Sequence, residues 1–302
     1  PDAAALAAQC ERVDALVWVP GVAASEVTAA HAALQPQWIH SFPAGVDGLR
    51  AFLTSPEFAA RPTPTTNGRG AFSSSLAEYA VMAILHFTKR VPRCLANANA
   101  KKWDKFVMPV VAGKTVGLVG FGHIAQATAR LCQAFGMRVI ACRRDATKPP
   151  APGDVKADAT YGVDEKLRLF EESDYVVCSL PSTAATHHFC GAAEFDAMKP
   201  TAVFVSLGRG AAVDEAALVE ALRTNAILGA ALDVFEQEPL PETSPLWGLG
   251  DKVLLTAHNA DLTEDYFALG WQVFAENYGT WAPGASAADT TWATPFDPAR
   301  GY

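Results

Sequence analysis

Several features that would place this chain in a specialised class of protein are absent from its sequence. No apolar run approaches the ~20 residues that a helix needs to cross a bilayer. The six cysteines form no CxxC pair and have no spacing to histidines that suits a zinc site. We therefore expect reduced, largely buried thiols, as in a protein of the cytoplasm.

Positive charge is also scarce. The 302 residues include 24 Lys and Arg against 32 Asp and Glu, which gives a formal net charge of −8. This balance argues against nucleic acid or an anionic membrane as a partner. An anionic small molecule remains compatible with it, provided that a local cation meets its negative charge.

What the sequence does contain is a regular alternation of apolar runs and helical patterns in its middle and second half. Such alternation predicts right-handed crossovers and a parallel sheet with helices on both faces, a doubly wound α/β domain. The helical patterns include 123–135 and 214–224. The predicted strands are 115–119, 138–142, 175–180, 202–207, 227–234 and 252–256.

The first ~75 residues predict a separate and smaller α/β domain, by the same pattern of strand and helix signals. A long apolar helix over 73–91 is expected to connect the two domains, and another over 264–282 lies near the end. The chain opens in a helix-like pattern before its first strand. We therefore expect residues to be missing ahead of Pro1, which leaves an organelle-targeting segment open beside a cytoplasmic location.

A glycine-rich turn marks a nucleotide site. Gly120, Gly122 and Ala125 fit the pattern GxGxxG/A, directly after a predicted strand and at the start of a helix. The first glycine makes the tight turn, the second admits the pyrophosphate, and the third small residue packs helix against strand. His123 and Ile124 open the helix, whose free amide groups would face the phosphates.

The end of the next predicted strand indicates which dinucleotide binds. An NAD enzyme carries Asp or Glu there for the ribose hydroxyls, whereas this chain has Arg143 followed by Arg144. Two guanidinium groups suit a 2′-phosphate through forked, charge-assisted hydrogen bonds. Asp145 lies two residues beyond the expected position and keeps NAD open, but the arginine pair favours NADP.

Three charged residues each follow a strand-like run in the second half. AVFVSLGRG leads to Arg209, ILGAALDVFEQEP to Glu238, and KVLLTAH to His258. A fixed cation, a carboxylate and an imidazole are the groups needed to hold a 2-oxo acid and protonate its carbonyl. Any one of them alone could be a surface charge on a loop, but ligands of open α/β sheets bind where strands end.

A pair of histidines, His187 and His188, lies in another loop. We interpret them as loop residues near the cofactor, because no further ligand is close to them in the sequence. No metal site is predicted.

Over most of its length the chain resembles the D-isomer-specific 2-hydroxyacid dehydrogenases, in particular the glyoxylate/hydroxypyruvate reductases. The resemblance rests on long motifs in the correct order: FPAGVDGL, SLAEYAVMAIL, the lone Trp103, GKTVGLVGFGHIAQ, SLPST, VSLGRGAAVDEAAL, GAALDVFEQEPLP, SPLW and TAHNA, with GY at the end. It implies two doubly wound α/β domains, a Rossmann cofactor domain and a smaller flavodoxin-like substrate domain with a cleft between them. It also implies a homodimer.

The resemblance implies boundaries and roles. The substrate-binding domain would comprise 1–74 and 272–302, and the dinucleotide-binding domain 75–271. Arg209 would hold the substrate carboxylate, Glu238 would assist the imidazole, and His258 would be the general acid in reduction. The loop of Ala44, Gly45 and Val46 would bind the substrate carboxylate. Further cofactor contacts would come from Leu180, Pro181, Thr186, Ser206, Leu207, Gly208 and Asp233.

The choice of substrate depends on the N-terminal part. No Lys or Arg occurs between Arg12 and Arg50, although a phosphorylated substrate would need a cation near its phosphate. We therefore expect a small uncharged or apolar 2-oxo acid such as glyoxylate or hydroxypyruvate. The alternatives are a 3-phosphoglycerate dehydrogenase and a nucleotide-sensing protein of the corepressor type, which the family also contains.

Overall fold

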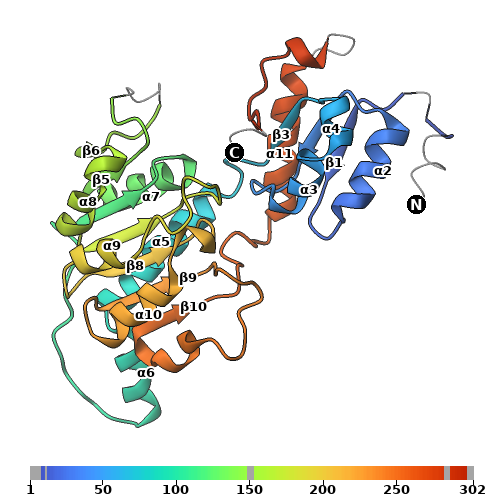
Figure 1. Ribbon diagram of the computed structural model, residues 1–302. Coiled ribbons are helices and arrows are strands. Elements are labelled where there is room, and N and C mark those ends of the chain that lie inside the picture. Colours follow the sequence, from blue (N-terminus) through green and yellow to red (C-terminus); the bar gives the residue numbers. More distant parts are fainter. Residues whose placement is uncertain (1–7, 11, 148–152, 282–285, 298–302) are drawn as a thin grey trace. The chain divides into compact units, whose positions relative to one another are not determined.

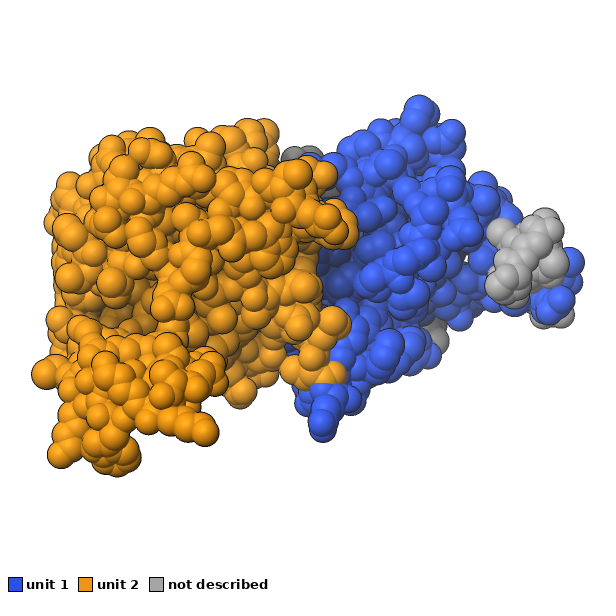
Figure 2. All heavy atoms as spheres, turned by 90° about the horizontal axis from the view of Figure 1, so that it is seen from below, with its two compact units in different colours: residues 1–72, 264–302 blue, residues 73–263 orange. Residues whose placement is uncertain are grey.

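The computed structural model describes residues 8–10, 12–147, 153–281 and 286–297. The chain divides into two compact units, residues 1–72 with 264–302 (unit 1) and residues 73–263 (unit 2), which are coloured separately in Figure 2. The sequence boundaries had been placed after 74 and after 271. The expected helical opening lies largely, and the terminal Gly-Tyr pair entirely, outside the described residues.

Unit 2 is built on a seven-stranded parallel sheet in the order β10-β9-β8-β7-β4-β5-β6 (Figure 1). The chain enters at β4, proceeds to β6 on one side, and returns to add β7 to β10 on the other, which is the doubly wound order that was predicted. The strands are β4 (Thr115–Val119), β5 (Arg138–Cys142), β6 (Ala159–Tyr161), β7 (Tyr175–Cys178), β8 (Val203–Ser206), β9 (Gly229–Leu232) and β10 (Val253–Leu255).

Helices cover both faces of this sheet, and the alternation of side chains along each strand explains why. Val116 and Leu118 of β4 lie in a core with α5 and α7, whereas Val119 lies in a second core with α8, α9 and α10. The helices of unit 2 are α5 (Ser73–Thr88), α6 (Val91–Asn99), α7 (His123–Ala134), α8 (Lys166–Glu172), α9 (Ala192–Ala197) and α10 (Glu215–Arg223), with 3-10 helices η2 (Val163–Glu165), η3 (Gly210–Ala212) and η4 (Pro245–Lys252).

The long helix expected over 73–91 is confirmed as α5, but it ends three residues earlier than predicted. α5 ends at Thr88, Arg90 adopts a left-handed conformation with φ of 52°, and α6 begins with Pro92 in its first turn. Proline lacks an amide hydrogen and clashes with the preceding turn, so it favours the start of a new helix over the continuation of the old one.

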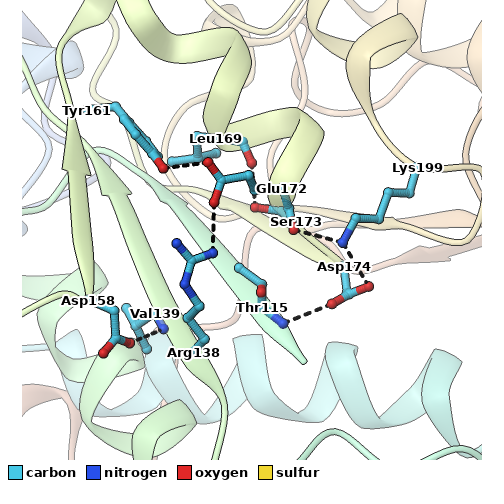
Figure 3. Close-up of polar contacts among 10 residues, drawn as sticks. All are labelled: Thr115, Arg138, Val139, Asp158, Tyr161, Leu169, Glu172, Ser173, Asp174 and Lys199. Atoms are coloured by element: carbon cyan, nitrogen blue, oxygen red, sulfur yellow. Dashed lines mark hydrogen bonds and ion pairs between the residues drawn. The ribbon is translucent and has the colours of Figure 1, made fainter. Parts of the chain in front are cut away.

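Polar contacts tie the first residues of β4 and β5 to the segment around α8 (Figure 3). Glu172 accepts hydrogen bonds from Tyr161 Oη (2.5 Å) and Arg138 Nη1 (2.8 Å), and Asp174 Oδ2 accepts one from the Thr115 amide (2.9 Å). The bonds from Tyr161 and Arg138 lower the pKa of the Glu172 carboxyl group. These contacts fix the amino ends of two central strands, at the edge of the sheet away from the glycine-rich turn.

Unit 1 contains a three-stranded parallel sheet, β1 (Ala15–Trp18), β2 (Trp38–Ser41) and β3 (Thr65–Asn67), in that order. Trp38 stacks on Phe274 of α11, while Ile39 lies in a core with α2 and α3 residues, so opposite faces of β2 meet different helices. The helices are α2 (Ala24–Leu34), α3 (Arg50–Leu53), α4 (Pro56–Ala60) and α11 (Tyr266–Thr280), with 3-10 helices η1 (Asp47–Leu49) and η5 (Ala287–Asp289). In the described part of the chain no helix combines the length and the apolarity needed to span a membrane.

The buried His40 makes the stability of unit 1 dependent on pH. It is 0% exposed, its Nδ1 lies 2.7 Å from Thr66 Oγ1, and burial lowers its pKa to about 4. An unfolded histidine titrates near pH ~6.5. Between these two values the unfolded chain therefore binds more protons than the folded one, and acid favours unfolding.

We expect His40→Gln to weaken this pH dependence. Between pH 7 and pH 5 the contribution of His40 to the free energy of unfolding should decrease by about 2 kcal/mol in the native protein and be absent in the variant. Urea unfolding of both proteins at the two pH values measures the difference, since the other titrating groups are common to both. Equal pH dependence in the two proteins would contradict this role for His40.

Candidate active site

The glycine-rich turn lies where the order of the sheet reverses. Gly120 follows β4 and has φ of 86°, and a side chain there would come within 3.1 Å of Leu180, which follows the neighbouring strand β7. A residue without a side chain is therefore required at this turn. Ligands of doubly wound sheets bind at the carboxyl ends of strands at such a reversal.

The turn is suited to a pyrophosphate. Gly122 precedes α7, no side chain caps that helix, and a methyl group built on Gly122 would have no atom within 4 Å. Ala125, in the third position of the motif, is 1% exposed and packs in the core beneath. Exposed His123 and half-buried Ile124 begin α7. The amide groups of the first turn and the open space above Gly122 fit the phosphates of a dinucleotide.

Arg143 and Arg144 are positioned beside this turn. Val119 of β4 pairs with Cys142 of β5, so Gly120 and Arg143 follow directly at the ends of adjacent strands. The Arg143 amide donates to Tyr161 O (3.1 Å), which fixes the backbone there. Asp145 Oδ1 accepts bonds from the amide and the hydroxyl of Thr147 (3.0 and 2.6 Å), so this carboxylate is engaged within its own loop.

The remaining cofactor candidates surround the same edge of the sheet. Leu180 and Pro181 follow β7, and Thr186 Oγ1 donates to Pro181 O (2.6 Å), which closes the loop between them. Ser206, Leu207 and Asp233 are only 1%, 3% and 1% exposed. We therefore expect a dinucleotide to meet mainly backbone atoms at these three positions and at Gly208.

The three candidate catalytic residues follow β8, β9 and β10, which are neighbours in the sheet. His258 Nδ1 and Glu238 Oε2 lie 2.6 Å apart, a charge-assisted hydrogen bond between residues 20 positions apart in the chain. Glu238 Oε1 also accepts from the Phe235 amide (3.0 Å). Because Nδ1 is engaged by Glu238, Nε2 is the atom of the imidazole left to exchange a proton with a ligand.

Arg209 is brought to the same region by a close backbone approach. It follows β8 and precedes η3, and its Nη1 donates to Gly208 O (2.8 Å). A methyl group on the next residue, Gly210, would lie 1.9 Å from the carbonyl of Phe235. Only glycine permits this contact between the loop of Arg209 and the loop that carries Glu238.

Asp233 organises the loop of His258, a role that the sequence did not reveal. Its backbone carbonyl accepts from the His258 amide (2.8 Å), and its carboxylate accepts from the amides of Asn259 and Ala260 (both 3.1 Å). Thr256 Oγ1 donates to the same carboxylate (2.6 Å). His258 adopts φ of 50°, a conformation that these bonds maintain.

The sequence could have pointed to Thr256 as a residue of this site, because it lies two residues before His258 and directly after β10. Its hydroxyl also lies 2.8 Å from Tyr79 Oη, and burial raises the pKa of Tyr79 to about 12. The Tyr79 hydroxyl is therefore neutral at physiological pH and serves as a hydrogen-bonding group.

The substrate-loop candidates lie in unit 1. Ala44 is exposed, Gly45 is partly exposed and Val46 is buried, directly after β2. Asn67 at the end of β3 donates from Nδ2 to Ala44 O (2.8 Å), and Ser41 Oγ donates to Pro43 O (3.0 Å). Asn67 was missed by the sequence analysis, although it ends the polar run TTN.

His187 and His188 are exposed, but the reasoning that left them without further ligands was incomplete. The fold brings Glu236 Oε1 to 2.7 Å from His188 Nε2, and Asp214 Oδ2 to 3.9 Å from His188 Nδ1. Both carboxylates are more than 25 positions away in the chain. His187 Nδ1 lies 3.1 Å from Ala211 O.

Comparison with known proteins identifies the family. Residues 81–260 match the family model "D-isomer specific 2-hydroxyacid dehydrogenase, NAD binding domain". The chain is 38% identical over 191 residues to glyoxylate/hydroxypyruvate reductase B of Enterobacter sp. (strain 638), over 61% of this chain and 57% of that protein. The chain spans between 53% and 64% of the length of three curated relatives that it matches.

Two solved structures share the fold over nearly the whole chain. One is a D-isomer specific 2-hydroxyacid dehydrogenase from Xanthobacter autotrophicus Py2, solved with NADPH and MES, with a TM-score of 0.78 and 27% identity over 96% of this chain and 85% of that one. The other is an NADPH-dependent glyoxylate/hydroxypyruvate reductase from Sinorhizobium meliloti, solved with NADP and sulfate. Its TM-score is 0.79 and its identity is 25%, over 98% of this chain and 89% of that one.

Proposed function

Since the chain belongs to the D-isomer specific 2-hydroxyacid dehydrogenase family, we propose that it reduces a small 2-oxo acid to the D-2-hydroxy acid at the expense of NADPH. The observation that carries the proposal is the 2.6 Å contact between His258 and Glu238, at the same edge of one sheet as Arg209 and the glycine-rich turn. A proton donor, an anion-binding cation and a dinucleotide site are the parts that carbonyl reduction requires.

Each residue has a distinct task in this proposal. NADPH, when bound, supplies the hydride. Arg209 holds the substrate carboxylate through its planar guanidinium and polarises the carbonyl. His258 delivers a proton from Nε2 to the carbonyl oxygen, and the Glu238 carboxylate orients the ring through its contact with Nδ1. We assign the amides of Ala44, Gly45 and Val46 in unit 1 a second contact to the carboxylate.

The proposed substrate is uncharged beyond its carboxylate. The two arginines that flank the cation-free stretch of unit 1 have partners, because Arg12 pairs with Asp14 and Arg50 pairs with Asp47 (3.3 Å). The next arginine, Arg61, donates to two backbone carbonyls, Gln35 O (2.8 Å) and Pro36 O (2.7 Å). Cofactor oxidation against a panel of 2-oxo acids tests the assignment, with higher kcat/KM expected for glyoxylate or hydroxypyruvate. Higher kcat/KM in the oxidation of 3-phosphoglycerate than in the reduction of hydroxypyruvate would overturn it. Turnover of none of these would favour the corepressor-type alternative.

For the cofactor, we expect the double variant Arg143→Ala/Arg144→Ala to raise KM for NADPH about a hundredfold and to leave KM for NADH within about threefold, because only the 2′-phosphate loses charge-assisted bonds. Steady-state kinetics with both cofactors measure this. Arg130→Ala is the matched control, since Arg130 is an exposed arginine on α7. An unchanged ratio of the two KM values would refute the assignment.

We also infer a homodimer. Within unit 2, the segment between α6 and β4 has neither helix nor strand (Figure 1). It exposes Trp103 (90%), Val107 (79%) and Val110 (62%). An apolar hollow of about 610 Å³, lined by Met82, Phe135 and neighbouring residues, lies on α5 and α7 of the same unit. Exposed apolar surface of this extent suits a second copy of the chain. Analytical ultracentrifugation should give twice 32.0 kDa, and a monomer at micromolar concentration would contradict the inference.

We propose a cytoplasmic location. All six cysteines are free thiols, and four of them (Cys132, Cys142, Cys178 and Cys190) are buried. Free thiols persist in reducing compartments. Fractionation of the source cells tests this, and recovery of the protein with an organelle or an export fraction would exclude it.

A further inference from the structure

The loop that carries Glu238 has no regular structure of its own. Residues 235–239 follow β9 and form neither helix nor strand, so their conformation depends on contacts with neighbouring segments. Within the loop, the Phe235 amide donates to Glu238 Oε1. The position of the carboxylate that meets His258 therefore depends on what holds this loop in place.

Glu236 connects the loop to the start of α10. Its amide donates to Glu215 Oε1 (2.6 Å), and the Glu215 amide donates to Glu236 Oε1 (3.2 Å), which forms a reciprocal pair. Two carboxylates placed this way repel each other, and burial together with the charges of Glu236 and Glu238 raises the pKa of Glu215. A nearby cation would stabilise the pair.

His188 provides that cation when it is protonated. Its Nε2 lies 2.7 Å from Glu236 Oε1, and its Nδ1 lies 3.9 Å from Asp214 Oδ2. His188 has φ of 48°, and its amide donates to Ala211 O (2.9 Å), so the backbone holds the ring between the two carboxylates. Left-handed backbone is uncommon for histidine and persists where surrounding contacts maintain it.

We propose that Glu236 is a positioning residue, which with His188 and Glu215 holds loop 235–239 so that Glu238 meets Nδ1 of His258. The inference rests on the proposed function, because it concerns the same proton donor. It adds residues to which no contact with the substrate or the cofactor is assigned above. Release of the loop would move the Glu238 carboxylate away from the imidazole and remove the hydrogen bond that orients the ring.

The same cluster offers three ligand atoms within 4.8 Å of one another, from His188, Asp214 and Glu236. The distances in the cluster fit a positioning role better than a metal site. Two ligands on a tetrahedral zinc ion lie about 3.4 Å apart, since each is about 2.1 Å from the metal. His188 Nε2 and Glu236 Oε1 are at hydrogen-bond separation instead, and Asp214 Oδ1 already caps α10 through the Ala217 amide (3.0 Å). Metal binding is therefore an outcome for the test to exclude.

Other charged groups also face the imidazole and remain in place in every variant used. Asp261 interacts electrostatically with His258, Asp233 and Arg209, and burial is the main cause of the raised pKa of the Asp261 carboxyl group. A change in activity caused by a Glu236 variant must therefore be separated from the effects of these other charged groups. Repeating the comparison in the Glu238→Gln background, which lacks the Glu238 charge, achieves this.

The experiment compares Glu236→Ala and Glu236→Gln in two backgrounds, the native sequence and Glu238→Gln. In the native background, Glu236→Ala should lower kcat about tenfold, with KM for the 2-oxo acid and Kd for NADPH unchanged within about twofold, because the proton donor is misoriented while the binding groups stay in place. Glu236→Gln, which retains an acceptor for the Glu215 amide, should give a smaller change. Glu220→Ala is the matched control, because Glu220 is exposed on the same α10 helix.

In the Glu238→Gln background the loss of kcat from Glu236→Ala should disappear, because no carboxylate is left to misplace. A loss of the same size in both backgrounds, or no loss in either, would overturn the proposal. If the native protein reduces no 2-oxo acid, the proposed function fails. The positioning role is then still measured by NMR titration of the His258 ring in the native protein and in Glu236→Ala.

If micromolar ZnCl₂ raises the Tm of the native protein but not that of Glu236→Ala, the cluster is a metal site instead.

Discussion

His258→Gln should lower kcat for 2-oxo acid reduction by a factor of about 10²–10⁴, since this is what a positioned general acid contributes to such a step. The ring is the group at this sheet edge whose Nε2 is left for a proton once Nδ1 is engaged by Glu238. Glutamine is uncharged and does not act as a proton donor at neutral pH. Single-turnover measurement of cofactor oxidation reports the loss directly.

Binding of NADPH should be retained in this variant, with Kd within about threefold. The glycine-rich turn follows β4, whereas His258 follows β10 at the edge of the sheet, three strands beyond β7. Glu238→Gln should have a smaller effect, about tenfold to a hundredfold, because it weakens the contact that orients the ring but leaves the ring itself. Activity of His258→Gln within tenfold of the native enzyme would exclude the proton-donor role.

Replacement of Arg209 should produce the second large loss. Arg209→Ala is expected to lower kcat/KM for the 2-oxo acid about a thousandfold, because a forked, charge-assisted contact to the substrate carboxylate and the polarisation of its carbonyl are both removed. Arg209→Lys should recover only a small part, since an ammonium group lacks the planar fork. The Gly208 carbonyl holds the native guanidinium at Nη1, and lysine would not reproduce that geometry.

Two controls distinguish this loss from misfolding. Addition of guanidinium chloride to Arg209→Ala should restore part of the activity, which requires an intact site around the vacated position. Arg223→Ala, an exposed arginine in the last turn of α10, should behave as the native protein. Loss of NADPH binding in Arg209→Ala in parallel with activity would instead indicate a role in the cofactor site.

The strands of unit 2 show how far apolar runs can predict this fold. Each predicted strand there contains the observed strand, and β4 and β5 have the predicted bounds. Strands buried on both faces produce continuous apolar runs that stand out in the sequence. β3 and β6 were not predicted, because each has three residues and includes polar ones: Thr65, Thr66 and Asn67 in β3, and Thr160 in β6.

The sequence predicted contacts between residues distant in the chain only where the order of the parallel strands is enough to bring those residues together. Residues that follow parallel strands share one edge of the sheet, which is why Arg209, Glu238 and His258 could be expected together. The 2.6 Å bond and the tautomer that it implies depend on loops without regular structure. The link from His188 to Glu236 joins a loop before α9 to one after β9, and no sequence pattern marks it.

The sequence by itself determined the family, the doubly wound sheet, the glycine-rich turn and the arginine pair beside it. These follow from local residue patterns, because hydrophobic periodicity and turn chemistry act over short stretches of chain. Only the tertiary structure decided how the active-site loops are held. Asp233 bonds the His258 loop, Gly210 lets two backbones touch, and Glu236 binds Glu215 and His188. Such contacts join residues that are distant in the chain, and folding alone brings them within hydrogen-bond reach.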